Sequence, residues 1–510
     1  MTSKQDIHDL IVVGGGVNGA GIAMDAAGRG LKVLLCEMND LASATSSCSS
    51  KLIHGGLRYL EFYEFRLVRE ALAERESLLK NAPHIMWPMR FRLPHQAHLR
   101  PAWMIRIGLF LYDNLAKREL LPGSHGISFD GSSAMVDSIR RGFEYSDGWV
   151  DDARLVVLTA KAAELHGASI MTRTRCVAAV RQKDLWLVTL EDQRTGRQST
   201  YQSRALVNAG GPWVSRLLGE AIKVKTPKQI RLVKGSHFVV PRIHDEEHSY
   251  ILQNEDGRIV FVIPYEENFS LVGTTDVDYQ GDPSSVTISE KETAYLISVV
   301  NSHFRCKICE SDIVWSFSGV RPLMDDESAS AQKASRDYTF EVDAEKGQAP
   351  LLSVFGGKIT TYRKLAEAAT DSICRFFPDA GPAWTHHAPL PGGDFTNHAE
   401  LQARYARRYP WLPARLLKRF VRTYGTCTDT ILAGCQSVED MGECFGDTLY
   451  AREVDYLVTQ EWAQAVEDII WRRTKLGLYL QHADNRQLQS YIGKLLETGT
   501  ASVDRVSHSA

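Results

Sequence analysis

Residues 9–37 read DLIVVGGGVNGAGIAMDAAGRGLKVLLCE, and this stretch decides the fold of the first unit of the chain. A short apolar run from Leu10 to Val13 ends at Gly14, Gly16 and Gly19, which have the G-x-G-x-x-G spacing of a strand-to-helix turn. In such turns the first glycine permits the bend, the second admits a pyrophosphate, and the third lets the helix pack on the strand. Unpaired N–H groups at the helix start would hold the phosphate charge.

The residues that follow support the same interpretation. Alanines and glycines keep the expected helix slender, and a second apolar strand over 31–36 ends at Glu37. An acidic residue at this distance from the glycines is where a ribose hydroxyl would be held. The whole pattern predicts an adenine dinucleotide site on a Rossmann-like unit rather than a plain strand–helix–strand unit. It does not distinguish NAD from FAD.

Length and composition limit the function classes. A chain of 510 residues is too long for one core, so we expect two or three domains. Its 59 basic and 62 acidic residues nearly balance, so no overall positive field indicates nucleic-acid binding. Nine scattered cysteines without a signal peptide favour a reducing, intracellular compartment. We expect no metal site, because the one C-x-x-C pair, Cys306 and Cys309, stands alone.

A loop rich in hydroxyl groups follows the first unit. It leads into two glycines, Gly55 and Gly56, with His54, Arg58 and Tyr59 around them, and paired glycines let the backbone approach a neighbour closely. Loops with this content line sites more often than they serve as solvated linkers, which is the alternative here. The loop residues are Thr45, Ser46, Ser47, Ser49, Ser50 and Lys51.

The middle of the chain reads as sheet. Two strands within 176–191 predict a hairpin or meander, and 205–209 predicts a strand that ends at Gly210. In a split nucleotide-binding domain such a strand returns beside the first strand; the alternative, which this segment alone would favour, is an ordinary strand–turn–helix unit. Residues 229–275 and 312–322 alternate as in an antiparallel sheet, which would make a substrate platform.

The last part contains a second glycine turn and then helices. Residues 352–366 read as strand, Gly-Gly turn and helix, with Lys358 beside a helix start that suits an anion. Residues 386–395 read as a linker, and 396–510 is helical throughout without a catalytic group of residues.

Four motifs together identify a family. They are VVGGGVNGAGIAMDAAGRG (12–30), SSKLIHGGLRYL (49–60), SGVRPL (318–323) and FGGKITTYRKLAE (355–367). They closely resemble the FAD-dependent (aerobic, respiratory) glycerol-3-phosphate dehydrogenases. The resemblance implies FAD as cofactor, sn-glycerol 3-phosphate as substrate, dihydroxyacetone phosphate as product and membrane quinone as electron acceptor.

The patterns and the resemblance together predict an α/β and α+β fold with three domains. We expect a discontinuous Rossmann-like FAD-binding domain, an inserted, mainly antiparallel domain for substrate and membrane contact, a C-terminal helical domain, and a homodimer. The expected ranges are 1–80, 145–225 and 330–385 for FAD, 81–144 and 226–329 for the inserted domain, and 386–510 for the helical domain.

Carried over residue by residue, the resemblance also implies the site. Arg321 and Arg336 would bind the phosphate, because a guanidinium group holds two oxygens at once. His237 is the candidate base for the C2 hydroxyl, with Lys358 or water as the alternative. Arg58 and Lys358 would hold negative charge on the flavin or the developing carbonyl, and Tyr59 and Thr274 complete the substrate set. The FAD set is Gly14, Gly16, Asn18, Gly19, Glu37, Thr45, Ser46, Ser47, Ser50, Lys51, Gly56, Gly210, Gly357, Lys358 and Thr360.

Residues 81–112 predict membrane contact. Between Glu76 and Asp113 the chain has no acidic residue, and five basic ones accumulate among aromatic residues. We expect an amphipathic helix whose apolar side lies shallowly in the cytoplasmic face of the inner membrane, with the basic side chains attracted to anionic lipid. The alternative is a core helix. The apolar side holds Trp103, Met104, Ile107, Phe110 and Leu111, and the basic residues are Lys80, Arg90, Arg92, Arg100 and Arg106.

Two other functions stay open at this level. A glycerol-3-phosphate oxidase would share nearly every site residue but pass its electrons to oxygen. A non-enzymatic FAD-binding protein, or a tRNA-modifying relative, would require Arg58, Arg321 and Lys358 to be structural.

Overall fold

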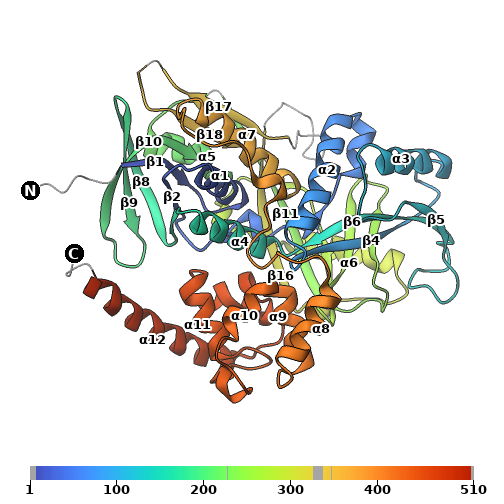
Figure 1. Cartoon of the computed structure of the whole chain (residues 1–510). Helices are drawn as coiled ribbons and strands as arrows, with labels where there is room; N and C mark the ends of the chain where they lie inside the picture. Colours follow the sequence, from blue (N-terminus) through green and yellow to red (C-terminus); the bar gives the residue numbers. More distant parts are fainter. Residues whose placement is uncertain (1–6, 227, 325–336, 346, 507–510) are drawn as a thin grey trace, which may run out of the picture.

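The first of two sheets carries the dinucleotide motif (Figure 1). The computed structural model describes residues 7–226, 228–324, 337–345 and 347–506. The eight strands of this sheet are β1 (Ile7–Val13), β2 (Val33–Cys36), β7 (Ser169–Met171), β8 (Thr174–Gln182), β9 (Leu185–Asp192), β10 (Gln198–Asn208), β17 (Thr339–Asp343) and β18 (Leu351–Phe355). Strands β18, β10, β1, β2 and β7 are parallel neighbours in that order. The strand expected over 205–209 is the end of β10, and it lies beside β1. The predicted hairpin is β8 and β9, which is antiparallel and joins the sheet through β10.

Helices cover the parallel strands on one face. These are α1 (Val17–Gly28), α4 (Asp152–Leu165) and α7 (Tyr362–Cys374), which pack on one another in the largest core. Close packing depends on small residues: a Cβ added at Gly21 would lie 3.1 Å from the Cβ of Ala366. The hairpin and α5 (Val214–Leu217) cover the other face, so the central strands are apolar throughout.

Within the described residues, the second sheet has ten strands and is antiparallel except where β12 lies parallel to β4. The antiparallel sheet predicted over 229–275 and 312–322 is present. The patterns gave no strand for β4, and the expected domain boundary at residue 145 falls inside β6. The strands are β3 (Leu52–Ile53), β4 (Met86–Pro94), β5 (His125–Ser128), β6 (Arg141–Val150), β11 (Ile230–Pro241), β12 (Ser249–Gln253), β13 (Ile259–Tyr265), β14 (Phe269–Gly273), β15 (Val277–Asp278) and β16 (Trp315–Met324).

Three helices accompany this sheet. They are α2 (Phe65–Asn81), α3 (Ala102–Asn114) and α6 (Glu290–His303). A capping box at Ser289 and Glu292 fixes the start of α6, whose apolar side closes a core against the sheet. Helix α3 lies at the end of the molecule marked by β5 (Figure 1).

The C-terminal part is helical, as predicted, and has its own core. It forms a separate group below the sheets in Figure 1. Among the described residues, no helix has both the length and the apolar character that crossing a bilayer requires. The helices are α8 (His398–Arg408), α9 (Ala414–Tyr424), α10 (Thr428–Ile431), α11 (Ala451–Gln460), the π-helix η11 (Asp468–Arg473) and α12 (His482–Val506).

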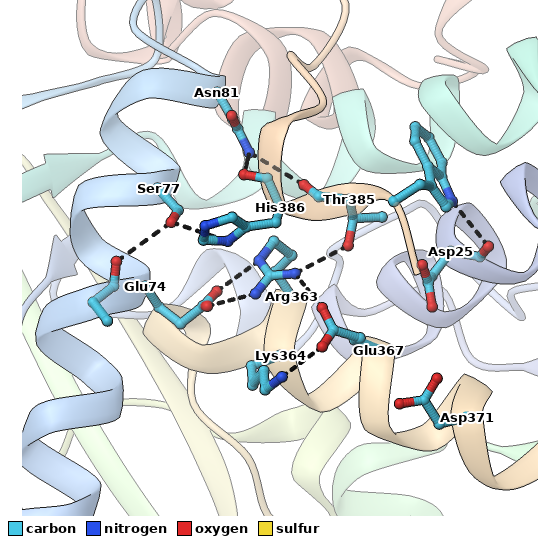
Figure 2. A network of polar contacts seen from close by, with 12 residues as sticks. Asp25, Glu74, Ser77, Asn81, Arg363, Lys364, Glu367, Asp371, Thr385 and His386 are labelled. Atoms are coloured by element: carbon cyan, nitrogen blue, oxygen red, sulfur yellow. Dashed lines mark hydrogen bonds and ion pairs between the residues drawn. The ribbon is translucent and has the colours of Figure 1, made fainter. Parts of the chain in front are cut away.

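The linker between α7 and α8 is held by polar contacts (Figure 2). Arg363 of α7 forms a buried ion pair with Glu74 of α2, 2.5 Å apart, and donates to the hydroxyl of Thr385 at 3.2 Å. Asn81 donates to the carbonyl oxygens of Thr385 and His386. The linker therefore binds α2 and α7 to each other.

Candidate functional site

A cavity of about 1110 Å³ lies where the two sheets meet. Its size exceeds the range of roughly 300–1,000 Å³ that is usual for small-ligand sites, so it has room for a large cofactor with a substrate beside it. It brings together most of the expected site residues. On its wall lie Gly14, Gly16, Asn18, Glu37, Thr45, Ser46, Ser50, Gly56, Arg58, Tyr59, Gly210, Thr274, Arg321, Gly357, Lys358 and Thr360.

The first glycine turn has the geometry that a pyrophosphate needs. Gly14 has a φ of +116°, and an added Cβ would lie 2.5 Å from the carbonyl oxygen of Ala209. A Cβ at Gly19 would lie 1.9 Å from the carbonyl oxygen of Gly14, so only glycine lets α1 approach β1 this closely. Beyond Gly16 the turn is open toward the cavity, apart from Ser46, whose hydroxyl accepts the Val17 N–H at 3.0 Å. The start of α1 can therefore accept a phosphate group.

Glu37 stands at the ribose position. Its carboxylate accepts the N–H of Gly15 at 2.7 Å and of Asn39 at 2.8 Å, which fixes it beside the turn. Burial raises the pKa of Glu37 although these hydrogen bonds favour the charged form. A carboxylate on the cavity wall between the turn and the loop fits the recognition of a ribose hydroxyl.

The hydroxyl-rich loop supports the cavity from two sides. Thr45 on the wall donates to the carbonyl of Val320 in β16 at 2.6 Å. Lys51 is buried behind the wall, where its ammonium group pairs with Asp152 at 2.7 Å and donates to the Ser47 carbonyl at 3.1 Å. In the part of the chain that the structure describes, Gly19, Ser47, Lys51 and His237 are expected site residues that do not line the cavity.

His237 reaches the cavity through Ser50. Its Nε2 lies 2.9 Å from the hydroxyl of Ser50, which is on the wall, and its ring stacks on Phe317 at 5.0 Å. Burial, with smaller contributions from Arg321 and Lys51, lowers the pKa of His237 well below its ordinary value. The lowered pKa favours the neutral imidazole near pH 7, and Ser50 is a wall residue that its Nε2 contacts.

The second glycine turn meets the first. Asn18 at the start of α1 donates to the carbonyl oxygen of Gly356 at 3.2 Å. Thr360, at the start of α7, accepts the N–H of His54 at 3.2 Å. The ammonium group of Lys358 lies over the ring of Tyr59, 4.1 Å from its centroid. Lys358 follows the second glycine turn and Tyr59 follows Gly55 and Gly56, so these two segments bring a cation and a phenol together on the cavity wall.

Two residues that the sequence did not indicate fix the turn before Arg58. The N–H of Gly55 donates to the hydroxyl of Tyr112, and that hydroxyl donates to Asp147 at 2.7 Å. Asp147 also pairs with Arg75 at 2.6 Å. No local pattern connects these positions. His54 also lies on the cavity wall, and its place in the glycine motif could have marked it.

Arg321 is the cation on the substrate side. One nitrogen of its guanidinium group donates to the hydroxyl of Thr274 at 3.1 Å, and another pairs with Asp276, which no sequence pattern indicates. All three line the cavity. A fork-shaped donor beside a hydroxyl group can hold two oxygens of a phosphate. Arg336 lies outside the described residues.

Comparisons with known proteins agree with this arrangement. Residues 9–363 match the family model described as FAD dependent oxidoreductase, and residues 383–497 match the C-terminal domain of alpha-glycerophosphate oxidase. The chain is 56% identical to the aerobic glycerol-3-phosphate dehydrogenase of Escherichia coli, over 96% of this chain and 97% of that protein. It is 50% identical to the D-erythritol 1-phosphate dehydrogenase of Brucella abortus, over 94% and 97%.

A solved structure has the same fold over nearly the whole chain. It is the X-ray structure of the glycerol-3-phosphate dehydrogenase from Bacillus halodurans complexed with FAD. The TM-score is 0.75 at 26% sequence identity, and the match covers 98% of this chain and 92% of that one.

Proposed function

The chain belongs to the FAD-dependent oxidoreductases and, among them, to the glycerol-3-phosphate dehydrogenases, and we propose that it oxidises sn-glycerol 3-phosphate to dihydroxyacetone phosphate and passes the electrons to membrane quinone. The observation that carries this proposal is the cavity, where Arg58, Arg321 and Lys358 line the same wall as the glycine turns that fit FAD. FAD supplies the ring that accepts a hydride from C2 of the substrate. The protein supplies position and charge.

Residues in and next to the cavity have three separate roles. Arg321 and Thr274 bind the phosphate, and for this Arg321 gives up part of its contact with Asp276. Lys358, held over Tyr59, stabilises the oxygen at C2 as it becomes a carbonyl. The C2 hydroxyl gives its proton to Ser50 while Ser50 gives its own proton to His237.

The variant Arg321→Lys should bind sn-glycerol 3-phosphate about 5- to 150-fold more weakly, which corresponds to roughly 1–3 kcal/mol. Lysine keeps the charge but loses the fork that holds two oxygens. FAD content should not change. The measurement is the apparent affinity in an anaerobic flavin-reduction titration.

Arg231→Lys is the matched control. Arg231 also forks onto a carboxylate, that of Asp278 at 2.6 and 2.7 Å, and its side chain is 21% exposed against 25% for Arg321. It does not line the cavity among the described residues. Unchanged affinity in Arg321→Lys, or an equal loss in Arg231→Lys, would remove Arg321 from the phosphate site.

D-erythritol 1-phosphate is a second candidate substrate, because a relative with that name is nearly as similar to this chain as the glycerol-3-phosphate dehydrogenase. Both compounds present a phosphate and a neighbouring hydroxyl. Rates of flavin reduction with each compound decide between them. Oxygen as the acceptor would be seen as hydrogen peroxide release under air.

The exposed face of α3 supports membrane attachment. Trp103, Ile107 and Phe110 are 63%, 51% and 58% exposed, whereas Leu109 and Tyr112 are the buried residues of this helix. The alternative of a core helix is therefore wrong for these three side chains. Large aromatic and aliphatic groups on one side of a surface helix suit the boundary between lipid headgroups and acyl chains.

The basic residues contribute less to this attachment than the sequence suggested. Arg90 pairs with Glu144 at 2.8 Å, Arg92 with Glu144 at 3.3 Å, and Lys80 with Glu119. Acidic side chains from other elements thus neutralise much of the segment. We propose peripheral attachment at the cytoplasmic face, with the apolar side of α3 as the main contact.

The cavity also extends to α3. Met104, Ile107 and Leu111 lie on its wall and are also partly exposed at the surface of the molecule. A quinone dissolved in the bilayer could approach the flavin along this apolar side without leaving the lipid. The same face would therefore serve for docking and for the electron acceptor.

Replacing Trp103, Ile107 and Phe110 together with serine should move the protein from the membrane fraction to the soluble fraction. Activity with membrane quinone should fall while activity with a soluble dye persists, because Trp103 and Phe110 do not line the cavity and Ile107 is not among the residues that bind FAD or substrate. The control replaces Leu165 and Val180, which are exposed apolar residues on other elements, with serine. A triple variant that stays on the membrane, or that loses FAD, would contradict the attachment.

A further inference from the structure

A short segment of the C-terminal helices contacts the loop that lines the FAD site. We call residues 468–475 the brace segment; it consists of the π-helix η11 followed by Thr474 and Lys475. Its charged side chains are largely buried and pair with residues of the FAD-binding part, and Arg473 also donates to the carbonyl oxygen of Glu461 in the C-terminal part. Nothing in the proposed chemistry uses these residues.

The first contact is made with Asp40, three residues after Glu37. Its fully buried carboxylate accepts Arg472 Nε at 2.5 Å and Arg473 Nη2 at 2.9 Å. Burial acts to raise the pKa of Asp40, but Arg473 and Arg472 outweigh it and lower the pKa. The loop is thus held at Asp40 by an ionised pair of guanidinium groups.

The second contact holds Asn39, the residue before Asp40 in the same loop. Asp468 pairs with Arg173 at 2.7 Å, and the backbone N–H of Arg173 donates to the carbonyl oxygen of Asn39 at 2.8 Å. Asp468 also pairs with Arg472, so both contacts belong to one network. Asn39 and Glu37 line the cavity, whereas Asp40 does not.

The third contact reaches the far end of the loop. Lys475 pairs with Asp151 at 2.9 Å, and the neighbouring Asp152 holds Lys51 and Ser49, each at 2.7 Å. Separately, the ring of Trp471 stacks on Trp315 of β16, with centroids 4.1 Å apart and an interplanar angle of 8°. The brace segment therefore contacts both the loop and the sheet on the substrate side.

We propose that the brace segment positions the FAD loop, residues 37–51, so that the C-terminal helices set how tightly the protein holds FAD. A loop fixed in its binding conformation loses less conformational entropy when the ligand binds. Asp40, Arg472 and Arg473 are positioning residues, because they act through the loop and do not line the cavity. The proposal depends on FAD as the cofactor and not on the identity of the substrate.

The test compares two variants of the contact with one control variant. Arg472→Lys keeps the charge but loses the second donor with which Arg472 joins Asp40 to Asp468, and Asp40→Asn removes the negative charge on the loop side of the same contact. Arg419→Lys is the control, because Arg419 and Glu453 form a bidentate pair inside the C-terminal helices. The exposure matches: 16% and 0% for Arg472 and Asp40, against 15% and 0% for Arg419 and Glu453.

The readout is the rate at which the holoenzyme releases FAD after dilution, followed by the fluorescence of free flavin. Circular dichroism at the same temperature reports whether the protein stays folded. We expect FAD release at least about tenfold faster in Arg472→Lys and Asp40→Asn, with unchanged circular dichroism, and release at the wild-type rate in Arg419→Lys. Wild-type release in both contact variants, or equally fast release in Arg419→Lys, would overturn the proposal.

Discussion

The variant Gly19→Ala should bind FAD at least about tenfold more weakly than the wild type and should therefore lose FAD during purification. The added Cβ would lie 1.9 Å from the carbonyl oxygen of Gly14 and 3.3 Å from the Cβ of Ala209, so α1 must move away from β1. Overpacking costs about 1–3 kcal/mol where side chains can adjust, and here the obstacle is backbone. The movement would open the turn that holds the pyrophosphate. The measurement is the flavin content of the purified protein.

Gly28→Ala is the control on the same helix. Its Cβ would meet the ring of Trp384 at 2.1 Å, which is comparable crowding at the end of α1 that is far from the turn. This variant should lose stability but keep FAD. If Gly19→Ala retained FAD at wild-type occupancy, the glycine turn would not be the pyrophosphate site.

The variant His237→Ala should keep FAD and reduce it about a hundredfold more slowly, or more slowly still, which is the usual loss when a general base is removed. Without His237, the Ser50 hydroxyl has no acceptor at 2.9 Å for its own proton, so it cannot take the proton of the C2 hydroxyl. Stopped-flow reduction by sn-glycerol 3-phosphate measures the rate. Because the pKa of His237 is lowered, its protonation should cause no change of rate near pH 6.5 in the wild type.

His244→Ala separates catalysis from packing. His244 is also buried, it stacks on Phe304 at 5.7 Å, and burial lowers its pKa to about 4. It does not line the cavity among the described residues. The control should lose stability while its reduction rate stays at the wild-type level. Reduction at full speed in His237→Ala would transfer the role of base to Lys358, His54 or water.

Features that depend on neighbours in sequence could be predicted. The return of β10 beside β1 is expected only by analogy with split nucleotide-binding domains, whereas the glycine turn and the hairpin β8–β9 follow from spacing and hydrophobic pattern. The helical C-terminal part followed from periodicity in the same way. These elements are local, or they obey the short list of connections that parallel sheets allow.

Features that depend on distant partners could not be predicted. The basic residues before α3 suggested an electropositive patch, but Glu144 on β6 pairs with both Arg90 and Arg92. Lys51 lies inside a cofactor motif and yet is turned away from the cavity by Asp152. The brace segment has no recognisable motif, because its proposed role depends on a contact with Asp40, which is more than four hundred residues away in the chain. A sequence shows which side chains carry charge, but the tertiary structure determines which groups those side chains contact.

Anaerobic addition of sn-glycerol 3-phosphate to the purified protein is the most direct test of the proposed function. We expect the absorbance of the oxidised flavin to bleach within the time of mixing and to return when a quinone analogue is added. Arg321→Lys should need more substrate for the same bleaching, since only phosphate binding is changed. A flavin that stays oxidised with sn-glycerol 3-phosphate, yet bleaches with dithionite, would contradict the function proposed for this protein.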